Sequence, residues 1–246
     1  MVAVLRWEAG PLAVTLITGA DRGLGRETAR RLIGAGHTVC IGARDKRLGE
    51  EAAAELGGRS VVLDVMDDAS VRAAAERVRA EAGHLDVLVD NAGIIGPGND
   101  AHDATAEQVR TAYETNVFGV IRVTHAFLPL LEASDSPVIV DVSSSLGSLG
   151  IAADPERFTS PLPVCYPALA YNSSEAALNM ITAQYARACP RMRINAVDPG
   201  HTATDLNGHT GPQTVTEGAG IIVRMALIGP DGPTGGFFGN NGPVSW

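Results

Sequence analysis

The sequence of 246 residues is poor in cysteine, with only Cys40, Cys165 and Cys189. Three thiols this far apart along the chain do not make a disulfide framework, and they lack the paired spacing of a zinc site. Their scarcity favours a reducing, intracellular setting, and we expect buried, unreactive thiols. Stability must therefore come from a hydrophobic core, which a chain of this length and composition can form.

Positive charge is also scarce in this sequence. Lysine and arginine together number 19 against 28 aspartate and glutamate residues, the formal net charge is -9, and Lys46 is the only lysine. Proteins bind nucleic-acid phosphates through dense basic patches, and the sequence contains none. A nucleic-acid-binding function is therefore excluded.

Long hydrophobic runs are missing as well. The apolar run at residues 12–17 is far shorter than the ~20 residues that cross a bilayer. No convincing small-residue cleavage site follows it, so it is not typical of a secretory signal. We expect a cytoplasmic protein with no membrane partner, in which residues 1–10 form an N-terminal extension.

Short apolar runs alternate with longer alanine-rich segments along the rest of the chain. The runs are apolar on both faces, as expected for a parallel sheet that helices cover on both sides. Expected strands read LAVTLIT, TVCIGA, SVVLD, LDVLVD, PVIVDVS and MRINAVD, and expected helices span residues 24–35, 46–56, 69–82, 105–131 and 167–188. The pattern predicts one α/β domain over residues 1–246, with a Rossmann-type doubly wound parallel sheet.

Two segments depart from this alternation. Residues 147–167 are rich in proline, and residues 202–216 are rich in glycine, threonine and asparagine. Long irregular loops in compact domains are usually functional. We expect both segments to be loops on the substrate side of the domain.

A glycine-rich stretch, TGADRGLG, follows the first expected strand and opens the first expected helix. Glycines there allow a tight turn, so that helix N–H groups and the positive end of the helix dipole can hold a pyrophosphate. The second strand ends in IGARDKR, where Arg44 stands in place of the acidic residue typical of an NAD site. Arg44 and Arg22 would suit a 2'-phosphate, which favours NADP(H) over NAD(H).

Further motifs follow these features along the chain. They are NAG at residues 91–93, NVFG with Asn116, VSSSLG with Ser144, Tyr171, and DPGHTATD at residues 198–205. From residue 12 onward the sequence resembles the short-chain dehydrogenase/reductase family, and more particularly its carbonyl reductases. The resemblance implies an NADP(H) site formed by Thr18, Gly19, Arg22, Gly23, Leu24, Gly25, Arg44, Asp64, Val65, Asn91, Ala92, Gly93, Pro199, Gly200, Thr202 and Thr204.

The same resemblance implies the catalytic roles. Tyr171 would exchange a proton with the substrate oxygen, Ser144 would hold that oxygen, and Asn116 would support a proton-relay water. The family has a lysine four residues after the tyrosine, whereas this chain has Glu175. Of the three serines in VSSSLG, Ser144 is selected because it stands three residues before the glycine.

Glu175 is the one departure from the family pattern. Residues four apart share a helix face, and two unit charges about 5 Å apart at an effective dielectric near 20 interact by roughly 3 kcal/mol. An ionised Glu175 would raise the tyrosine pKa, which impairs alcohol oxidation more than carbonyl reduction. Two alternatives stay open: Glu175 points to solvent, or Arg187 or Arg191 supplies the missing cation.

Three functions stay open at this point. The favoured one is NADPH-dependent reduction of a ketone or aldehyde; the others are non-redox acid/base chemistry by Tyr171 and Glu175, and NADP binding without catalysis. Leu146, Ile95 and Leu206 would give an apolar substrate pocket. Residues 147–167 would wall that pocket or cover a helix face that many relatives use to oligomerise, so a homo-oligomer and a monomer both stay open.

Overall fold

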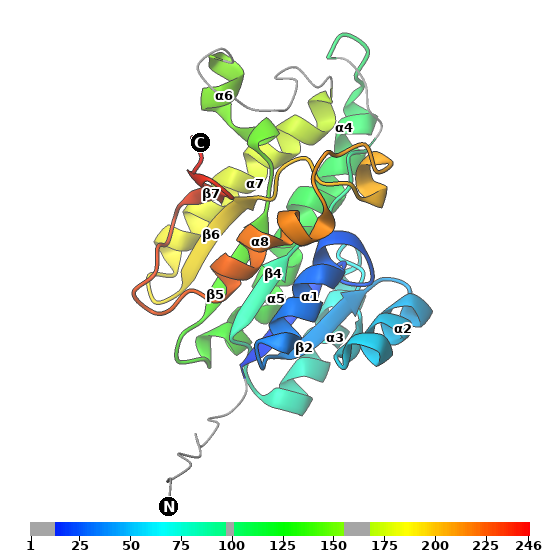
Figure 1. Cartoon of the computed structure of the whole chain (residues 1–246), viewed down its shortest axis with the longest axis vertical. Coiled ribbons are helices and arrows are strands. Elements are labelled where there is room, and N and C mark those ends of the chain that lie inside the picture. The colour runs from blue at the N-terminus through cyan, green and yellow to red at the C-terminus, as the bar shows by residue number, and fades with distance from the viewer. Residues whose placement is uncertain (1–12, 97–100, 155–167) are drawn as a thin grey trace, which may run out of the picture.

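One mostly parallel sheet forms the centre of the computed structural model, which describes residues 13–96, 101–154 and 168–246 (Figure 1). Its strands are β1 (Val14–Thr18), β2 (Thr38–Ala43), β3 (Arg59–Val62), β4 (Val87–Asp90), β5 (Val138–Val142), β6 (Arg193–Asp198), β7 (Phe237–Gly239) and β8 (Gly242–Pro243). Their order is β3-β2-β1-β4-β5-β6-β7-β8, and only the β7–β8 pair is antiparallel. The predicted doubly wound sheet is confirmed.

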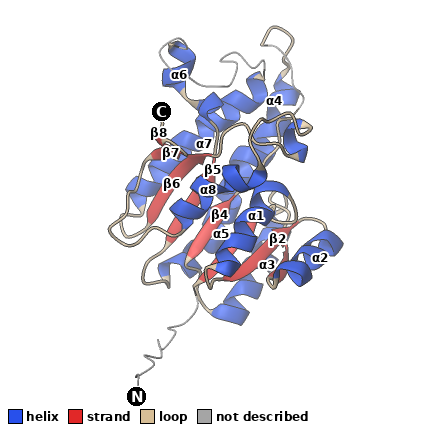
Figure 2. Cartoon of the chain, in the orientation of Figure 1, coloured by secondary structure: helices blue, strands red, loops and turns tan. Residues whose placement is uncertain are grey.

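Helices cover both faces of this sheet, as the colours of Figure 2 show. One core joins the sheet to α1 (Gly23–Gly34), α2 (Lys46–Leu56) and α8 (Val215–Ala226). The other joins the opposite face to α3 (Asp68–Ala82), α5 (Val120–Glu132) and α7 (Leu169–Ala188). Side chains alternate along each strand, so Ile17, Val89 and Val140 face the first core while Leu16, Leu88 and Ile139 face the second.

The helix expected over residues 105–131 is not continuous. It divides into α4 (Ala106–Tyr113), a π-helical segment (Glu114–Gly119) and α5. The segment contains no proline, and its helical apolar spacing gives no sign of a break. A π-helical turn holds one extra residue and is frequent at functional sites, and here it contains the buried side chain of Asn116.

The C-terminal part of the chain contains helix and strand that the sequence pattern did not predict. Residues 202–216 are only partly irregular, because Asp205–Asn207 is a 3-10 turn and α8 begins at Val215. Two glycines weaken the helical pattern of α8. Packing favours glycine at position 218, since a Cβ there would overlap Thr202 Oγ1 and would lie 2.9 Å from Leu24 Cδ2 on α1. The short helix α6 (Leu149–Ala153) was also missed.

Two of the three thiols belong to the described residues. Cys40 is buried in the sheet and Cys189 is half-buried at the end of α7, and neither forms a disulfide. Cys165 lies outside the described residues. Within residues 13–96, 101–154 and 168–246, no helix combines the length and the hydropathy needed to cross a membrane.

Candidate active site

The expected site residues gather at the carboxyl edge of the parallel strands. Thr18 ends β1, Arg44 follows β2, Asn91 follows β4, and Ser144 stands two residues beyond β5. In doubly wound sheets ligands bind outside this edge. The helices α4 and α6 lie at the same end of the molecule (Figure 1).

Glycines bring the start of α1 close to the sheet. Gly19 and Gly23 have φ angles of 62° and 53°, in the left-handed region that favours glycine. A Cβ on Gly25 would lie 2.5 Å from Asn91 Nδ2 and 2.6 Å from the Gly19 carbonyl oxygen. The first turn of α1 therefore begins at the strand edge, where its free N–H groups suit an anionic pyrophosphate.

Thr18 and Asn91 tie the glycine loop to the end of β4. The Thr18 hydroxyl accepts hydrogen bonds from the backbone N–H groups of Asn91 and Ala92, both at 2.9 Å. Asn91 Nδ2 donates to the carbonyl oxygens of Thr18 (2.8 Å) and Gly19 (3.1 Å). These bonds fix the loop and leave Gly93 exposed beyond them.

The two arginines expected at a 2'-phosphate differ in their partners. Arg22 is ion-paired to Asp21 at 3.0 Å and lies 3.7 Å from an Asp205 carboxylate oxygen. Arg44 is exposed, and no described residue forms an ion pair or hydrogen bond with its side chain. Arg44 is therefore the cation available at the end of β2.

Asp64 and Val65 lie in the turn that follows β3. One Asp64 carboxylate oxygen accepts a hydrogen bond from the Met66 N–H at 3.0 Å, and the Asp64 N–H donates to Ser70 Oγ at 3.0 Å. Val65 is buried against Gly119 of the π-helical segment. The turn is thus fixed against the π-helical segment, and its contact with adenine stays a prediction.

The segment after β6 contains four of the expected cofactor residues. It also contains Gln213, whose structural role was not predicted. Gln213 Nε2 donates to the Pro199 carbonyl oxygen at 2.5 Å and to Thr202 Oγ1 at 2.8 Å. Gly200 has a φ of 79°, and Thr204 caps the 3-10 turn that follows it. Gln213 closes this loop, although its position in the sequence suggested only an irregular segment.

Ser144 and Tyr171 approach each other from different elements. Ser144 stands after β5 and its Oγ accepts a hydrogen bond from the Leu146 N–H at 3.2 Å, while Tyr171 lies in the first turn of α7. Burial raises the pKa of Tyr171 well above its usual value, and the negative charges that Glu175 and Asp198 carry when they are ionised raise it further. A hydrogen bond with Ser144 opposes that rise. Tyr171 is therefore a neutral phenol that can donate a proton.

Glu175 is buried, so the alternative in which it points to solvent is wrong. Only 4% of its surface is exposed, because Gly147 packs directly on this turn of α7: a Cβ on Gly147 would lie 2.5 Å from the Glu175 carbonyl carbon. Burial raises the pKa of Glu175 to about 8, the Asp198 charge adds to the rise, and a hydrogen bond with Ser143 opposes it. Near pH 7 this carboxyl is mostly neutral.

Neither arginine considered as a substitute cation reaches this carboxyl. Arg187 is exposed and lies twelve residues further along α7, about 18 Å at 1.5 Å per residue. Arg191 is exposed beyond the end of the helix. Lys46 is the first residue of α2 and lies 3.8 Å from Glu50.

Asn116 joins the loop after β4 to α7. Its Oδ1 accepts from the Ile94 N–H at 2.9 Å, and its Nδ2 donates to the Ile94 carbonyl oxygen (2.9 Å) and to Ser174 Oγ (3.0 Å). Ser174 Oγ in turn donates to the Tyr171 carbonyl oxygen at 2.8 Å. The Asn116 side chain thus positions the first turn of α7.

Sequence reasoning missed several buried polar residues next to this centre. Ser143 Oγ donates to Asn179 Oδ1 at 2.6 Å, and Asp198 accepts hydrogen bonds from the Gly200 N–H at 2.9 Å and from Ser145. Burial raises the pKa of Asp198. Asn179 was detectable as the next polar residue after Glu175 at a spacing of four, on the same face of the helix.

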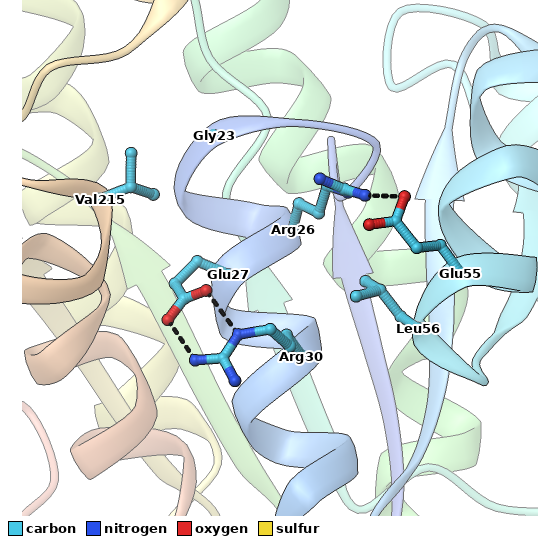
Figure 3. A pocket seen from close by; sticks show the side chains of 7 residues that line it. All are labelled: Gly23, Arg26, Glu27, Arg30, Glu55, Leu56 and Val215. Atoms are coloured by element: carbon cyan, nitrogen blue, oxygen red, sulfur yellow. Dashed lines mark hydrogen bonds and ion pairs between the residues drawn. The ribbon is translucent and has the colours of Figure 1, made fainter.

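A shallow pocket lies beside the cofactor loop, between α1, α2 and α8 (Figure 3). Its charged side chains are already paired with one another: Arg30 Nη2 is 2.7 Å from a Glu27 oxygen, and Arg26 contacts Glu55. Gly23 and Val215 form part of its wall. The pocket borders the cofactor loop and contains none of the expected catalytic residues.

The sequence and the fold match those of a known family. Residues 13–160 match the family model described as short chain dehydrogenase. The chain belongs to the short-chain dehydrogenase family. It is 37% identical over 279 aligned positions to a (+)-neomenthol dehydrogenase of Arabidopsis thaliana, an alignment that covers 91% of this chain and 94% of the relative.

Solved structures agree with this membership. Salutaridine reductase from Papaver somniferum superposes with a TM-score of 0.79 at 30% identity, over 93% of this chain and 99% of that one. An NADPH-bound carbonyl reductase from chicken fatty liver superposes with a TM-score of 0.83 at 27% identity, over 96% of this chain and 100% of that one. The similarity therefore extends beyond the matched N-terminal segment to α7 and α8.

Proposed function

We propose that this protein reduces a ketone or aldehyde to an alcohol with NADPH. The observation that carries the proposal is the contact between Ser144 and a neutral, half-buried Tyr171 at the carboxyl edge of the sheet. A neutral phenol is the protonation state that reduction needs, because the carbonyl oxygen must gain a proton as the carbon gains hydride. The names of the relatives, which include dehydrogenases and reductases, support the same reaction class.

Each site residue has a defined task in this reaction. When bound, the nicotinamide supplies hydride to the carbonyl carbon. Ser144 donates a hydrogen bond to the carbonyl oxygen, and Tyr171 transfers its phenolic proton to that oxygen. The neutral carboxyl of Glu175 leaves no extra negative charge beside Tyr171, so the phenol is not made a still weaker acid.

The cofactor preference rests on Arg44. The glycine loop, Thr18 and Asn91 fit a dinucleotide pyrophosphate of either cofactor, and only a 2'-phosphate requires a nearby cation. Arg44 is exposed and has no partner among the described residues, so its guanidinium is available to that phosphate. The NADPH-bound carbonyl reductase from chicken fatty liver supports this choice, although a 3-ketoacyl-(acyl-carrier-protein) reductase from Brucella melitensis is complexed with NADH.

An apolar carbonyl compound is the proposed substrate. Leu206 is exposed, and Leu146 and Ile95 are half-buried, so all three retain apolar surface that a substrate could contact. The relatives' names include neomenthol dehydrogenase and isopiperitenone reductase. A panel of cyclic and open-chain apolar ketones and aldehydes is therefore the appropriate first screen.

The test compares NADPH oxidation by the wild type, Tyr171→Phe and Tyr113→Phe. Tyr113 is the matched control because its hydroxyl also contacts α7, at the Ser173 carbonyl oxygen (3.2 Å). We expect Tyr171→Phe to lower kcat by roughly 10²- to 10⁴-fold while NADPH still binds, and Tyr113→Phe to keep its activity. Equal rates in all three proteins would contradict the assignment of Tyr171.

One observation favours a second function, non-redox acid/base chemistry. Two neutral acids, Tyr171 and Glu175, lie one helical turn apart in a buried site. Such a pair suits a proton-shifting reaction such as an isomerisation or dehydration. In that case the substrate would be converted while the concentration of NADPH stays constant.

A further inference from the structure

A layer of buried polar side chains lies between α7 and β5. Glu175, Asn179 and Thr182 occupy one face of α7, and each is at most 4% exposed. Asp141 and Ser143 face them from the same side of β5, since residues two apart in a strand point the same way. Burying this many polar groups is costly unless they are hydrogen-bonded or serve a function.

Hydrogen bonds connect part of this layer. Ser143 Oγ donates to Asn179 Oδ1 at 2.6 Å. Ser143 also hydrogen-bonds Glu175, and this bond opposes the rise in the Glu175 pKa, so the Ser143 hydroxyl links the Glu175 carboxyl to Asn179. Further along, Thr182 Oγ1 donates to Asp141 Oδ2 at 2.6 Å.

Three atoms of the layer have no hydrogen-bonding partner among the described residues: Glu175 Oε2, Asn179 Nδ2 and Asp141 Oδ1. One is a donor and the other two are carboxyl oxygens, and all three are buried. Buried polar atoms without protein partners are typically satisfied by internal water, which needs two to four such groups. Glu175 and Asn179 lie one helical turn apart on α7, whereas the Asp141 carboxyl lies beside Thr182, about two turns from Glu175, so more than one internal water is needed to join the three atoms.

The deep end of the layer is a pair of carboxyls. Asp90 and Asp141 are register partners on the neighbouring strands β4 and β5, and both are buried. Burial raises the pKa of both, and their mutual repulsion means that the pair retains a proton near neutral pH. Thr124 Oγ1 donates to Asp90 at 3.3 Å, and the half-buried Tyr185 of α7 faces both carboxyls.

We propose that this layer is an internal proton path in which buried water joins the Asp90–Asp141 pair to Tyr171 through Asn179 and Glu175. The path serves the reductase activity proposed above. In each reduction the Tyr171 O–H bond breaks as the alcohol O–H bond forms. Glu175 then gives its carboxyl proton to the phenolate and regains one, through water, from the aspartate pair. No electron moves along the path, and between turnovers the buried pair recovers its proton from solvent on the side of the half-buried Tyr185.

Asn179 is the positioning residue that tests this path, because it belongs to the layer and is not assigned to substrate or cofactor. Asn179→Leu removes both the acceptor for Ser143 and the unpartnered donor at similar volume. Asn179→Ser keeps a polar group and leaves room for water, so it should restore function. Thr28→Val is the matched control, since Thr28 on α1 also has a buried hydroxyl without a partner among the described residues and lies outside the layer.

The first readout needs no turnover. Infrared spectroscopy of the cofactor-free protein should show a neutral carboxyl band that is lost in Glu175→Gln and titrates near pH 8 in the wild type. Two other groups near Glu175 bear on its titration: Tyr171 on α7 and Asp198 on β6, and both are unchanged in the Asn179 variants. Asn179→Leu should shift this titration by about one pH unit or more, because its hydrogen-bonded environment is lost. Thr28→Val should leave it unchanged.

The second readout is the rate of carbonyl reduction in H₂O and D₂O. Asn179→Leu should lower kcat by about tenfold and raise the solvent isotope effect, with NADPH affinity unchanged and Asn179→Ser close to wild type. An unshifted infrared titration, or an active Asn179→Leu enzyme with wild-type kcat and isotope effect, would overturn the path. If no carbonyl compound is reduced at all, the reductase proposal fails, and the infrared titration alone decides whether Asn179 and Glu175 are connected.

Discussion

The two halves of the site are built in opposite ways. In the cofactor half, Thr18 and Asn91 satisfy each other through four hydrogen bonds to backbone groups, and the glycines permit contacts too close for a side chain. In the catalytic half, Glu175 and Asn179 are both buried, and each has an atom without a partner among the described residues. The first half, formed by residues 18–25 and Asn91 and called the cradle below, is held in a fixed shape. The second half contains groups that can change protonation.

This difference separates the requirements of binding from those of proton transfer. A dinucleotide needs a fixed shape and a helix N-terminus, which neutral, fully bonded groups provide. Proton transfer needs acids whose pKa lies near the working pH, which burial provides for Glu175. Changes in the cradle should therefore alter affinity, and changes in the catalytic half should alter rate and pH dependence.

The largest expected effect is the pH dependence of stability caused by Glu175. Its pKa is raised in the folded protein, so the unfolded chain releases its proton first, and folding stability falls as the pH rises from about 4.5 to 8. Relative to the wild type, the unfolding free energy of Glu175→Gln should rise by up to about 1.4 kcal/mol for each pH unit in this window.

Urea unfolding at pH 5, 6, 7 and 8 measures this difference. The other buried carboxyls are present in both proteins and cancel in the comparison. Glu51→Gln, on the exposed face of α2, should change stability by no more than about 0.5 kcal/mol at any of these pH values. A wild type and Glu175→Gln that differ by the same amount at every pH would mean that Glu175 is ionised in the folded state.

The next effect distinguishes the two halves by a single methyl group. Gly25→Ala places a Cβ 2.5 Å from Asn91 Nδ2 in the cradle, and Gly147→Ala places one 2.5 Å from the Glu175 backbone. Each should cost about 1–3 kcal/mol of stability through overpacking. We expect Gly25→Ala to weaken NADPH binding, and Gly147→Ala to lower kcat with a smaller effect on the NADPH dissociation constant.

Calorimetric NADPH titration and steady-state kinetics separate these outcomes. Gly34→Ala is the control, because a Cβ there meets no atom within 4 Å and the residue belongs to α1. It should be neutral or stabilise by about 0.5–1 kcal/mol. If Gly147→Ala weakened NADPH binding as strongly as Gly25→Ala, the division into two halves would be wrong.

The smallest expected effect concerns the preference for NADPH over NADH. Arg44→Gln should weaken NADPH binding by about tenfold, since a charge-assisted hydrogen bond contributes roughly 1.5–3 kcal/mol and an exposed one less. NADH binding should not change. Lys46→Gln removes the same charge two residues away, where it lies near Glu50, and should leave both affinities unaltered. Equal losses for NADPH and NADH would show that Arg44 does not distinguish them.

Much of the fold and the cradle could be predicted because local patterns determine them. Apolar runs marked the first six strands, and glycines marked the tight loop at Thr18 to Gly25. The helix α8 could not be predicted, since the close packing of Gly218 against Thr202 and Leu24, which favours a glycine there, is a tertiary contact. The π-helical turn around Asn116 could not be predicted for the same reason, because its hydrogen bonds to Ile94 join distant parts of the chain.

In the proposed catalytic half, the relative placement of Tyr171 and Glu175 was predictable, and the protonation of Glu175 was not. The spacing of Tyr171 and Glu175 placed both on one helix face, as the structure has them. Whether Glu175 carries a charge depends on its burial under Gly147 and on the nearby Asp198. The spacing of residues in the sequence indicates neither of these contacts. The sequence therefore indicated a conflict between an acid and a tyrosine that burial largely removes.

The most direct test of the central claim is the rate of NADPH oxidation at pH 7 by the wild type and by Glu175→Lys, with the same ketone. A neutral Glu175 that supports reduction predicts that the wild type turns over within about tenfold of the lysine variant, with both proteins binding NADPH. A wild type that binds NADPH yet turns over only after the change to lysine would contradict the claim, since Glu175 would then disable the reaction.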